Sequence, residues 1–415
     1  MKGEKVDSCM QRILIIGGGF GGLSVACRLL RSSIAKQIAI TIIDPRSASV
    51  YTPWLHTAAA GTIGRDTSNV RADFAFDYFA GIRFRHETMQ SIDPVARTVT
   101  CADGSMIAYD ICVLAPGSVA NDFGIPGAKQ YAKTLKHTGD ASMIRSEMAR
   151  ITHAAQESSQ RIVVAGAGAN GIELAAECAA TVRRFERQGK IPRRSIEVVL
   201  VDSGTEPLPM LPRLLRNAVH RRLRHLGIIL RMQTMLVNVA EHSVGLRHID
   251  HGTPAESVEV IVCNLCITAL GVKMPEFIGA LSFEKNAQGR ILVDDTLRAL
   301  GYRDIFILGD AAVLRDGVYP DPQTAQAAVQ QSGIVARNIV AMIEKKPVIA
   351  YQQKKRWDII IALGERYAIG TAFGVPVLGY TGHIIRLFID AKYFLGLPHF
   401  VSFRLAASKI RSMYR

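Results

Sequence analysis

The sequence predicts an α/β fold with two nested domains and a C-terminal amphipathic helical segment. Two stretches show the same order of an apolar run, a glycine-rich turn, a helix and a second apolar run: RILIIGGGFGGLSVACRLL with IAITIID, and RIVVAGAGANGIELAAECAA with IEVVLVD. This order is typical of a βαβ unit with parallel strands, and each repeat ends on an aspartate. At 415 residues the chain is long enough for two or three domains of about 150 residues each.

Later apolar runs place the domain boundaries. Buried strands are predicted in YDICVLAPGS at 109–118, in VEVIVCNLCITALG at 258–271 and in DIFILGD at 304–310, the last of which is expected to open a new helix. We therefore assign residues 1–120 and 285–345 to one discontinuous domain, residues 121–284 to a domain inserted in it, and residues 346–415 to the C-terminal segment.

The first glycine turn predicts a dinucleotide site. Gly17 permits the tight turn, Gly19 lacks the Cβ that would block a pyrophosphate, and Gly22 lets helix and strand pack closely. The helix N-terminus, where Phe20 stands, offers free N–H groups to phosphates. Asp44 ends the next strand, where its carboxylate can accept hydrogen bonds from both ribose hydroxyls and would repel a 2′-phosphate.

The second glycine turn repeats this design in the inserted domain. Gly166, Gly168 and Gly171 form the turn, and Asp202 ends the following strand. No arginine follows Asp202 directly, which favours NADH over NADPH. Glu173 is placed in the first turn of the helix, and two interpretations stay open. It complements the helix dipole, or it lies near the nicotinamide and orients it or relays a proton.

Composition restricts the partners and the compartment. The formal net charge of +14 indicates an anionic partner. No zinc-finger spacing, RNP-like aromatic motif or helix-turn-helix pattern is present, so a membrane surface is favoured over nucleic acid. An odd number of cysteines, seven, and an N-terminus unlike a signal peptide indicate the cytoplasmic side without disulfides. No run of about 18 apolar residues predicts a membrane-spanning helix.

The C-terminal segment predicts two amphipathic helices separated by Gly396 and Pro398. Their apolar stripes comprise Ile384, Phe388, Ala391 and Leu395 in the first, and Phe400, Phe403, Ala407, Ile410 and Tyr414 in the second, with Arg404, Arg411 and Arg415 along its edge. Such stripes fit an anchor lying in the plane of a membrane, where long basic side chains reach the headgroups. Docking onto the protein's own core or onto a second subunit in a homodimer is the alternative.

With these motifs assembled, the chain resembles the type II NADH dehydrogenases, single-subunit flavoenzymes that pass electrons from NADH to quinone. Beyond the glycine turns, the resemblance covers nearly the whole chain and rests on YTPWLHTAAAGT at 51–62, FGIPGAKQYAKTLKHTGDASMIR at 123–145, GRILVDDTLR at 289–298 and PQTAQAAVQQSG at 322–333. It implies two Rossmann-like domains, an enzyme that does not pump protons, and a peripheral position on the cytoplasmic face of the inner or plasma membrane.

The resemblance also implies roles for particular residues. Asp310 would hold the ribityl chain of FAD bound at the first turn, although a helix N-cap is an equally good interpretation of it. Gln326 and Gln330 would face quinone from one side of a helix. The implied cofactor contacts further include Pro53, Gly271, Gly309 and Ala325. NADH would be the substrate at the second turn.

Two other functions remain as alternatives. A sulfide:quinone reductase needs well-placed cysteines, and none follows Cys266. Cys263 and Cys266 are expected on opposite faces of a buried strand and without a redox role. A non-catalytic NADH-sensing flavoprotein resembling apoptosis-inducing factors is the second alternative. No metal site is expected, because the scattered histidines lack supporting ligands: His220, His225, His242, His248 and His251.

Overall fold

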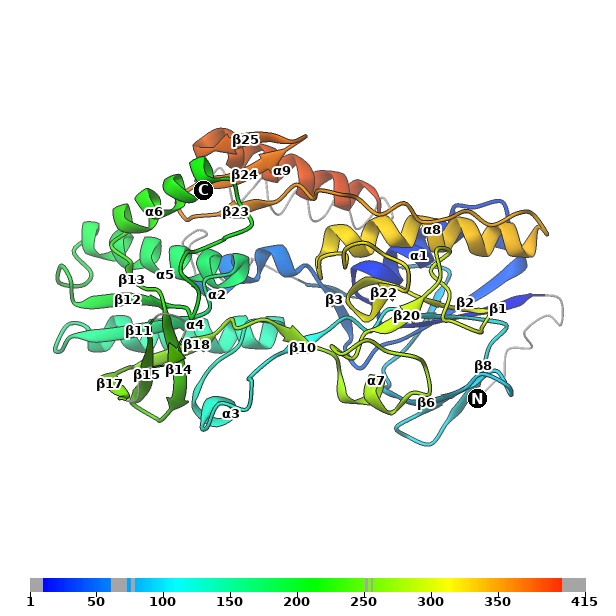
Figure 1. The fold of residues 1–415 in the computed structure, drawn as a ribbon, viewed down its shortest axis with the longest axis horizontal. Coiled ribbons are helices and arrows are strands. Elements are labelled where there is room, and N and C mark those ends of the chain that lie inside the picture. The colour runs from blue at the N-terminus through cyan, green and yellow to red at the C-terminus, as the bar shows by residue number, and fades with distance from the viewer. Residues whose placement is uncertain (1–9, 61–72, 76–78, 251–252, 255–256, 398–415) are drawn as a thin grey trace.

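The structure is a computed structural model that describes residues 10–60, 73–75, 79–250, 253–254 and 257–397. The chain forms two lobes, and the C-terminal segment lies along one edge above their junction (Figure 1). None of the helices in the described part of the chain is both long enough and apolar enough to span a lipid bilayer.

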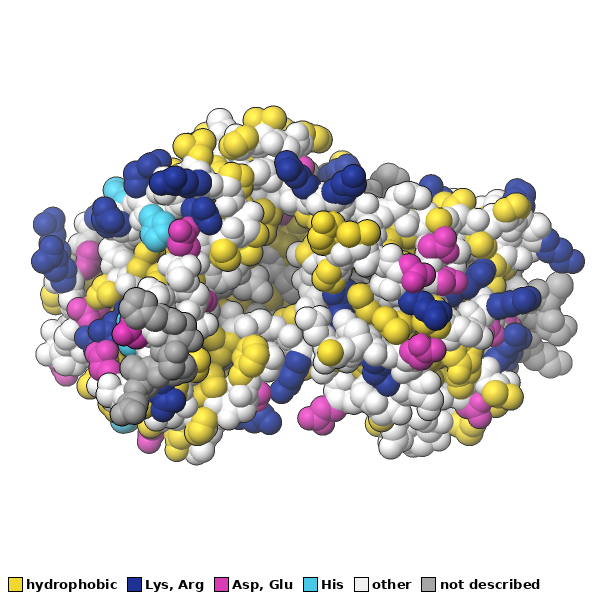
Figure 2. Space-filling view, viewed as in Figure 1, with side chains coloured by type: hydrophobic (Ala, Val, Ile, Leu, Met, Phe, Trp, Pro, Cys, Tyr) yellow, Lys and Arg dark blue, Asp and Glu magenta, His cyan; other side chains and the backbone are white. Residues whose placement is uncertain are grey.

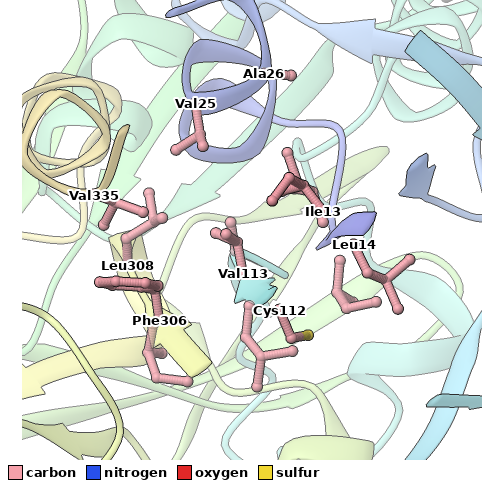
Figure 3. Packing of buried hydrophobic residues seen from close by; sticks show 14 of the residues in the cluster. Ile13, Leu14, Val25, Ala26, Cys112, Val113, Phe306, Leu308 and Val335 are labelled. Atoms are coloured by element: carbon pink, nitrogen blue, oxygen red, sulfur yellow. The ribbon is translucent and has the colours of Figure 1, made fainter. Parts of the chain in front are cut away.

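A five-stranded parallel sheet forms the core of the first lobe, in the order β21-β9-β1-β2-β5. Its strands are β1 (Gln11–Ile16), β2 (Ile38–Ile43), β5 (Ile82–Arg85), β9 (Ile111–Leu114) and β21 (Ile305–Ile307). The sheet thus joins chain from before and after the second lobe. Helices α1 (Phe20–Leu30) and α8 (Ala325–Ile343) pack side by side on it. From these helices, Val25 and Val335 point into the same core as Ile13 and Val113 of the sheet (Figure 3).

A four-stranded parallel sheet, in the order β13-β12-β11-β18, forms the second lobe. Its strands are β11 (Gln160–Ala165), β12 (Ile196–Val201), β13 (Ile229–Arg231) and β18 (Leu265–Thr268), and its helices are α4 (Thr138–Ala154), α5 (Ala169–Arg187) and α6 (Arg213–His225). An antiparallel layer adds β14 (Thr234–Val239), β15 (Ser243–Asp250), β16 (Thr253–Pro254) and β17 (Glu259–Val262).

One predicted strand of this lobe is in fact two. The run at 258–271 contributes β17 to the antiparallel layer and β18 to the parallel sheet, with a break at Cys263 and Asn264. Asn264 stabilises the break, because its Oδ1 accepts a hydrogen bond from the Arg161 N–H at 2.8 Å. Continuous hydrophobicity gave no sign of this change of sheet, since both halves are apolar.

Smaller elements complete and connect the lobes. In the first lobe these are η1 (Ala35–Gln37), β3 (Ala48–Val50), η2 (Thr52–Trp54), β4 (Asp73–Ala75), β6 (Met89–Asp93), β7 (Thr98–Cys101), β8 (Met106–Ala108), α7 (Glu276–Ala280), β20 (Ile291–Val293), η5 (Gly309–Ala311) and β22 (Ala312–Leu314). Helix α2 (Leu55–Ala60) packs instead against α4 and α5 of the second lobe. The antiparallel pair β10 (Val119–Ala120) and β19 (Val272–Lys273) links the lobes, and α3 (Ala128–Tyr131) follows it.

The C-terminal segment begins with an antiparallel sheet of β23 (Ile360–Ala362), β24 (Ala368–Ala372) and β25 (Val375–Leu378). Helix α9 (Gly379–Leu395) follows at once and ends before Gly396, which confirms the first predicted amphipathic helix. The second predicted helix, with Phe400, Phe403, Ala407, Ile410 and Tyr414, lies outside the described residues, as do Arg404, Arg411 and Arg415.

Candidate functional site

Both predicted glycine turns connect a parallel strand to a helix, and their outer glycines are required by the backbone. Gly17 has a φ of +101°, and a Cβ there would lie 2.2 Å from the carbonyl oxygen of Ala115. A Cβ on Gly22 would lie 2.0 Å from the carbonyl oxygen of Gly17. Gly166 and Gly171 repeat this geometry, with a φ of +111° at Gly166 and equally close carbonyl oxygens. A side chain at any of these positions would break the turn.

The middle glycine of each turn is different, because nothing in the protein requires it. A Cβ on Gly19 or Gly168 would meet no atom within 4 Å. Each residue caps its helix with a φ that any amino acid adopts, −80° at Gly19 and −73° at Gly168. The open space lies at a helix N-terminus, where unpaired N–H groups attract phosphate. The residues present therefore fit a pyrophosphate group at both turns.

The aspartates that end the next strands have unequal surroundings. Asp44 is buried, and its carboxylate accepts hydrogen bonds from the Gly18 N–H at 2.7 Å and from the backbone and guanidinium of Arg46. Burial alone would raise the pKa of Asp44, but Arg46 holds that pKa below its ordinary value. Because a carboxylate has about four acceptor positions, the ribose hydroxyls predicted to bind Asp44 would have to take the place of hydrogen bonds from Arg46.

Asp202, in contrast, keeps acceptor positions for a ligand. From the described part of the chain it accepts hydrogen bonds from two backbone N–H groups, those of Ala167 and Gly204, each at 2.6 Å. No ion pair with a basic side chain involves Asp202 within the described ranges, so two hydroxyl groups could still bind it.

Asp310 belongs to a partly buried chain of polar side chains at the end of the first sheet. The Ser118 hydroxyl donates a hydrogen bond to its carboxylate, and the Lys136 ammonium donates to Ser118 at 3.0 Å. Burial lowers the pKa of Lys136, an effect that the carboxylate of Asp310 opposes. Gly309 donates its N–H to the Gln331 side chain at 2.7 Å. Ser118, Lys136 and Gln331 were missed by the sequence reasoning, because no spacing pattern marks them.

The helix expected to begin at Asp310 is not there. Gly309 and Asp310 lie in a single 3-10 turn, η5, which leads into strand β22, and the cap of that turn is Leu308. The interpretation of Asp310 as a helix N-cap is therefore wrong. A long helix, α8, begins only at Ala325, after an N-cap at Thr324.

The predicted glutamine pair lies on α8. This helix passes close to the turn that contains Asp310. A Cβ on Gly309 would lie 3.5 Å from the Cβ of Ala328, so the helix and the turn are in contact. Gln326 is exposed, whereas Gln330 is partly buried. The Oε1 atom of Gln330 is buried and accepts no hydrogen bond from the described part of the protein. A buried acceptor without a donor is costly unless a ligand or water satisfies it.

Glu173 is held by a buried ion pair that joins three parts of the chain. It is the fifth residue of α5, beyond the first turn, so dipole complementarity is not its main interaction. Its carboxylate accepts hydrogen bonds from the Arg386 guanidinium of α9 and from the Ala362 N–H at 3.0 Å. His56 Nδ1 lies 3.4 Å away, and Arg386 also donates to the Pro53 carbonyl oxygen at 2.8 Å.

This environment favours the ionised form of Glu173. Burial by itself raises the pKa of the carboxyl group, but Arg386, with support from His56 and the Ala362 N–H, brings the pKa of Glu173 below its ordinary value. A depressed pKa means that the ion pair stabilises the fold at neutral pH and loses this contribution as the pH falls through that pKa.

Replacing Glu173 by glutamine is expected to lower the free energy of unfolding by about 3 kcal/mol, because Arg386 would stay buried without a counter-charge. Urea unfolding at neutral pH measures this loss. The control Glu147→Gln removes the partly exposed partner of the exposed Arg150 and should cost less than about 1 kcal/mol. The double variant Glu173→Met, Arg386→Met should recover most of the stability. Similar losses for Glu173→Gln and Glu147→Gln would contradict this account.

The inner face of α9 also contacts the first glycine turn. Asp390 accepts hydrogen bonds from the Tyr51 hydroxyl at 2.7 Å and from Trp54 Nε1 at 3.0 Å. Phe20, the first residue of α1, packs against Tyr51 and Tyr393, with ring centroids 5.5 and 4.9 Å away. Helix α9 thus contacts residues beside both glycine turns. The sequence did contain one sign of these contacts: Arg386 and Asp390 are a base and an acid four residues apart in an otherwise apolar helix.

Two further predictions concern residues outside this region. Gly271 has a φ of +118°, and its carbonyl oxygen accepts a hydrogen bond from the Asn121 N–H at the link between the lobes.

The expectation that Cys263 and Cys266 lie on opposite faces is wrong, because a side-chain hydrogen bond joins them in one buried cluster. Cys263 precedes strand β18, so strand alternation does not apply to it. Among the residues described, no group of three His, Cys, Asp or Glu side chains could hold a metal ion.

Comparison with known proteins gives consistent results. The family model described as pyridine nucleotide-disulphide oxidoreductase matches residues 11–332. Type II NADH:quinone oxidoreductases of Staphylococcus saprophyticus and Staphylococcus aureus are each 25% identical to the chain over 390 residues, which are 92% of this chain and 94% of the relative.

Solved structures share the fold. The NDH2 of Plasmodium falciparum, solved in complex with NADH, superposes with a TM-score of 0.83 at 18% identity, covering 97% of this chain and 98% of the other. The sulfide:quinone oxidoreductase of Aquifex aeolicus gives a TM-score of 0.77 at 19% identity, covering 94% and 93%.

Proposed function

The chain belongs to the pyridine nucleotide-disulphide oxidoreductase family, and we propose that it is a type II NADH:quinone oxidoreductase that binds FAD at the first glycine turn and NADH at the second. The observation that carries this proposal is the open space at Gly19 and Gly168, one phosphate cradle in each lobe. The relatives that match almost the whole chain carry this activity in their names.

The first lobe offers the groups that a resident FAD needs. The turn from Gly17 to Gly22 and the N-terminus of α1 would hold the pyrophosphate, and Asp310 would accept hydrogen bonds from the ribityl hydroxyls. Ser118 and Lys136 fix the Asp310 carboxylate in place. When bound, FAD accepts two electrons from NADH and passes them to quinone, while the protein supplies orientation and electrostatics.

The second lobe offers a site for a substrate that comes and goes. Gly168 and the N-terminus of α5 would bind the NADH pyrophosphate, and the free acceptor positions of Asp202 suit two ribose hydroxyls. An additional 2′-phosphate would meet the charge of Asp202, so we expect NADH to be preferred over NADPH. Glu173, ionised and fixed by Arg386, would orient the nicotinamide rather than donate a proton from a neutral acid.

Quinone would bind beside α8. The buried Oε1 of Gln330 has no hydrogen-bond donor among the residues that the structure describes, and Gln326 lies one turn away on the same face. Because α8 contacts the Asp310 turn, a quinone at these amides would lie close to residues that would hold the flavin. The amide groups would hold the quinone head through hydrogen bonds. No proton pumping is proposed.

The variant Gln330→Leu is expected to slow reduction of a soluble short-chain quinone about tenfold, the effect of about 1.4 kcal/mol for one lost hydrogen bond. The rate at which NADH bleaches the flavin absorbance should stay unchanged. Stopped-flow absorbance under anaerobic conditions measures the two half-reactions separately. Gln323→Leu, an exposed position before the helix, is the control. Equal slowing of both half-reactions would argue against a quinone contact at Gln330.

We also propose that the protein sits on the cytoplasmic face of a membrane, where a hydrophobic quinone is dissolved. The outer side of the β24–β25 hairpin and α9 carries large exposed apolar side chains, here called the C-terminal apolar surface: Phe373, Val375, Tyr380, Phe388 and Leu395. Phe373 is 95% exposed and Leu395 74%. This surface suits insertion into the headgroup region. A second subunit in a homodimer is the other occupant to test.

The alternative of a sulfide:quinone reductase has less support. The likeness to the Aquifex aeolicus enzyme concerns the fold. All six cysteines in the described part of the chain are buried, including Cys263 and Cys266. Buried thiols with raised pKa values, such as those of Cys112 and Cys178, are poor nucleophiles. The hydrogen bond with Cys266 lowers the pKa of Cys263 instead, but this thiol is buried like the other described ones, so none of them is exposed to sulfide.

A further inference from the structure

Helix α6 in the second lobe carries an unusual concentration of positive charge. Its sequence, RLLRNAVHRRLRH, contains five arginines, two histidines and no acid. One face of the helix is apolar and packs on the lobe through Leu215, Ala218, Val219 and Leu223. The arginines on the other sides of the helix are not needed for this packing, so they require another explanation.

Two of these arginines are used inside the protein. Arg216 pairs with Glu206 at 3.1 Å. Arg222 donates to the carbonyl oxygens of Leu363 and Gly364 at 3.0 and 2.9 Å, and its guanidinium stacks on the Tyr367 ring at 4.7 Å. These contacts fasten α6 to the turn between β23 and β24. Helix α6 and the C-terminal sheet therefore form one continuous surface.

The remaining arginines point outward beside this junction. Arg213, Arg221 and Arg224 are exposed and, among the residues described, form no ion pair. Leu214, which lies next to Arg213, is 61% exposed and adds apolar area. Figure 2 shows basic side chains grouped on the upper left of the molecule, directly beside the apolar cap formed by the C-terminal segment. Figure 1 places α6 and β25 at the same two positions.

We propose that the outer face of α6, centred on Arg221 and Arg224, binds anionic lipid headgroups while the C-terminal apolar surface enters the same bilayer. This inference rests on the proposed membrane position of the enzyme. The occupant follows from the chemistry: unpaired guanidinium groups beside exposed aromatic and aliphatic side chains match a surface that presents phosphate next to hydrocarbon. The proposal also accounts for part of the net charge of +14.

This arrangement would let the membrane set the orientation of the protein on its surface. The C-terminal apolar surface alone could enter any bilayer, whereas the arginines select a negatively charged one and fix the rotation of the second lobe relative to it. The contribution of exposed charges is screened within about 10 Å at 0.1 M salt, so it should weaken as salt is added.

Sedimentation of the full-length protein with lipid vesicles tests the proposal. Vesicles of phosphatidylcholine alone are compared with vesicles that also contain phosphatidylglycerol. The double variant Arg221→Gln, Arg224→Gln is expected to bind the anionic vesicles about thirtyfold more weakly than the natural protein, since each of the two bases near the surface contributes about 1 kcal/mol. Binding to neutral vesicles and turnover with NADH and a soluble quinone should not change.

A charge-matched control separates this site from net charge. Lys129→Gln, Lys273→Gln also removes two positive charges, at residues that share Asp122 as partner. Helix α3, which carries Lys129, lies at the opposite edge of the molecule from β25 in Figure 1. This control should bind anionic vesicles like the natural protein. Equal weakening of both double variants, or binding indifferent to phosphatidylglycerol, would overturn the proposal.

Other results would identify which part of the account fails. Loss of all vesicle binding in the natural protein, with normal turnover of a soluble quinone, would overturn the membrane position and this inference but keep the redox function. Vesicle binding as expected, without any quinone turnover, would keep the surface and overturn the proposed function.

Discussion

Replacing Gly168 by valine is expected to abolish reduction of the flavin by NADH and to leave a folded, yellow protein. The new side chain would meet no protein atom within 4 Å, and the φ of −73° suits valine. It would instead fill the space at the N-terminus of α5, where the pyrophosphate must come close to the backbone. A loss of NADH affinity of about a thousandfold is expected, equivalent to about 4 kcal/mol.

An anaerobic NADH titration that follows the flavin absorbance measures this effect. The control is Gly139→Val in α4, where a Cβ also meets nothing within 4 Å and the glycine is exposed. It should behave as the natural protein does. If the flavin of Gly168→Val were still reduced at the NADH concentrations that reduce the natural protein, the second glycine turn would not be the NADH site.

The variant Gly19→Val is expected to produce a folded but colourless protein. Gly19 caps α1 with a φ of −80° and also faces open space, so valine would block the FAD pyrophosphate without disturbing the turn. Absorbance of the purified protein and the FAD released on denaturation measure the occupancy, which should fall below about one hundredth of normal. Circular dichroism checks the fold.

The two middle-glycine variants together assign the cofactors. Gly19→Val should lose bound FAD, whereas Gly168→Val should keep it and lose only the response to NADH. Loss of bound FAD in Gly168→Val with retention in Gly19→Val would reverse the assignment of the two lobes.

The glycine turns could be predicted from the sequence because their signal is local. The positive φ of Gly17 and the close approach of Gly22 to the Gly17 carbonyl oxygen involve residues that are neighbours in the sequence. The parallel strands beside them were likewise visible as apolar β-branched runs. The same reasoning failed where apolar sequence changes sheets, at Cys263, and where a strand followed a short turn, at Asp310.

Contacts between distant segments could not be read in this way. Glu173 and Arg386 are 213 residues apart, and the local sequence alone accounts for each of them. Glu173 stands near the start of a helix, and Arg386 is a basic residue in an amphipathic helix. Only the fold shows that they neutralise each other. Arg46 is only two residues from Asp44 in the sequence, but its bidentate hydrogen bonds to that carboxylate depend on the turn after β2. Ser118 and Lys136 become a pair only at the edge of the completed sheet.

The most direct test of the central claim is an anaerobic experiment on the natural protein in two additions. NADH is added first, and a soluble short-chain quinone second, while the flavin absorbance is followed. The account predicts that NADH bleaches the flavin and that quinone restores its colour with one quinone reduced per NADH. A flavin that stays oxidised with NADH would contradict the account, and so would a flavin that bleaches but stays reduced after quinone, as expected of a non-catalytic NADH sensor.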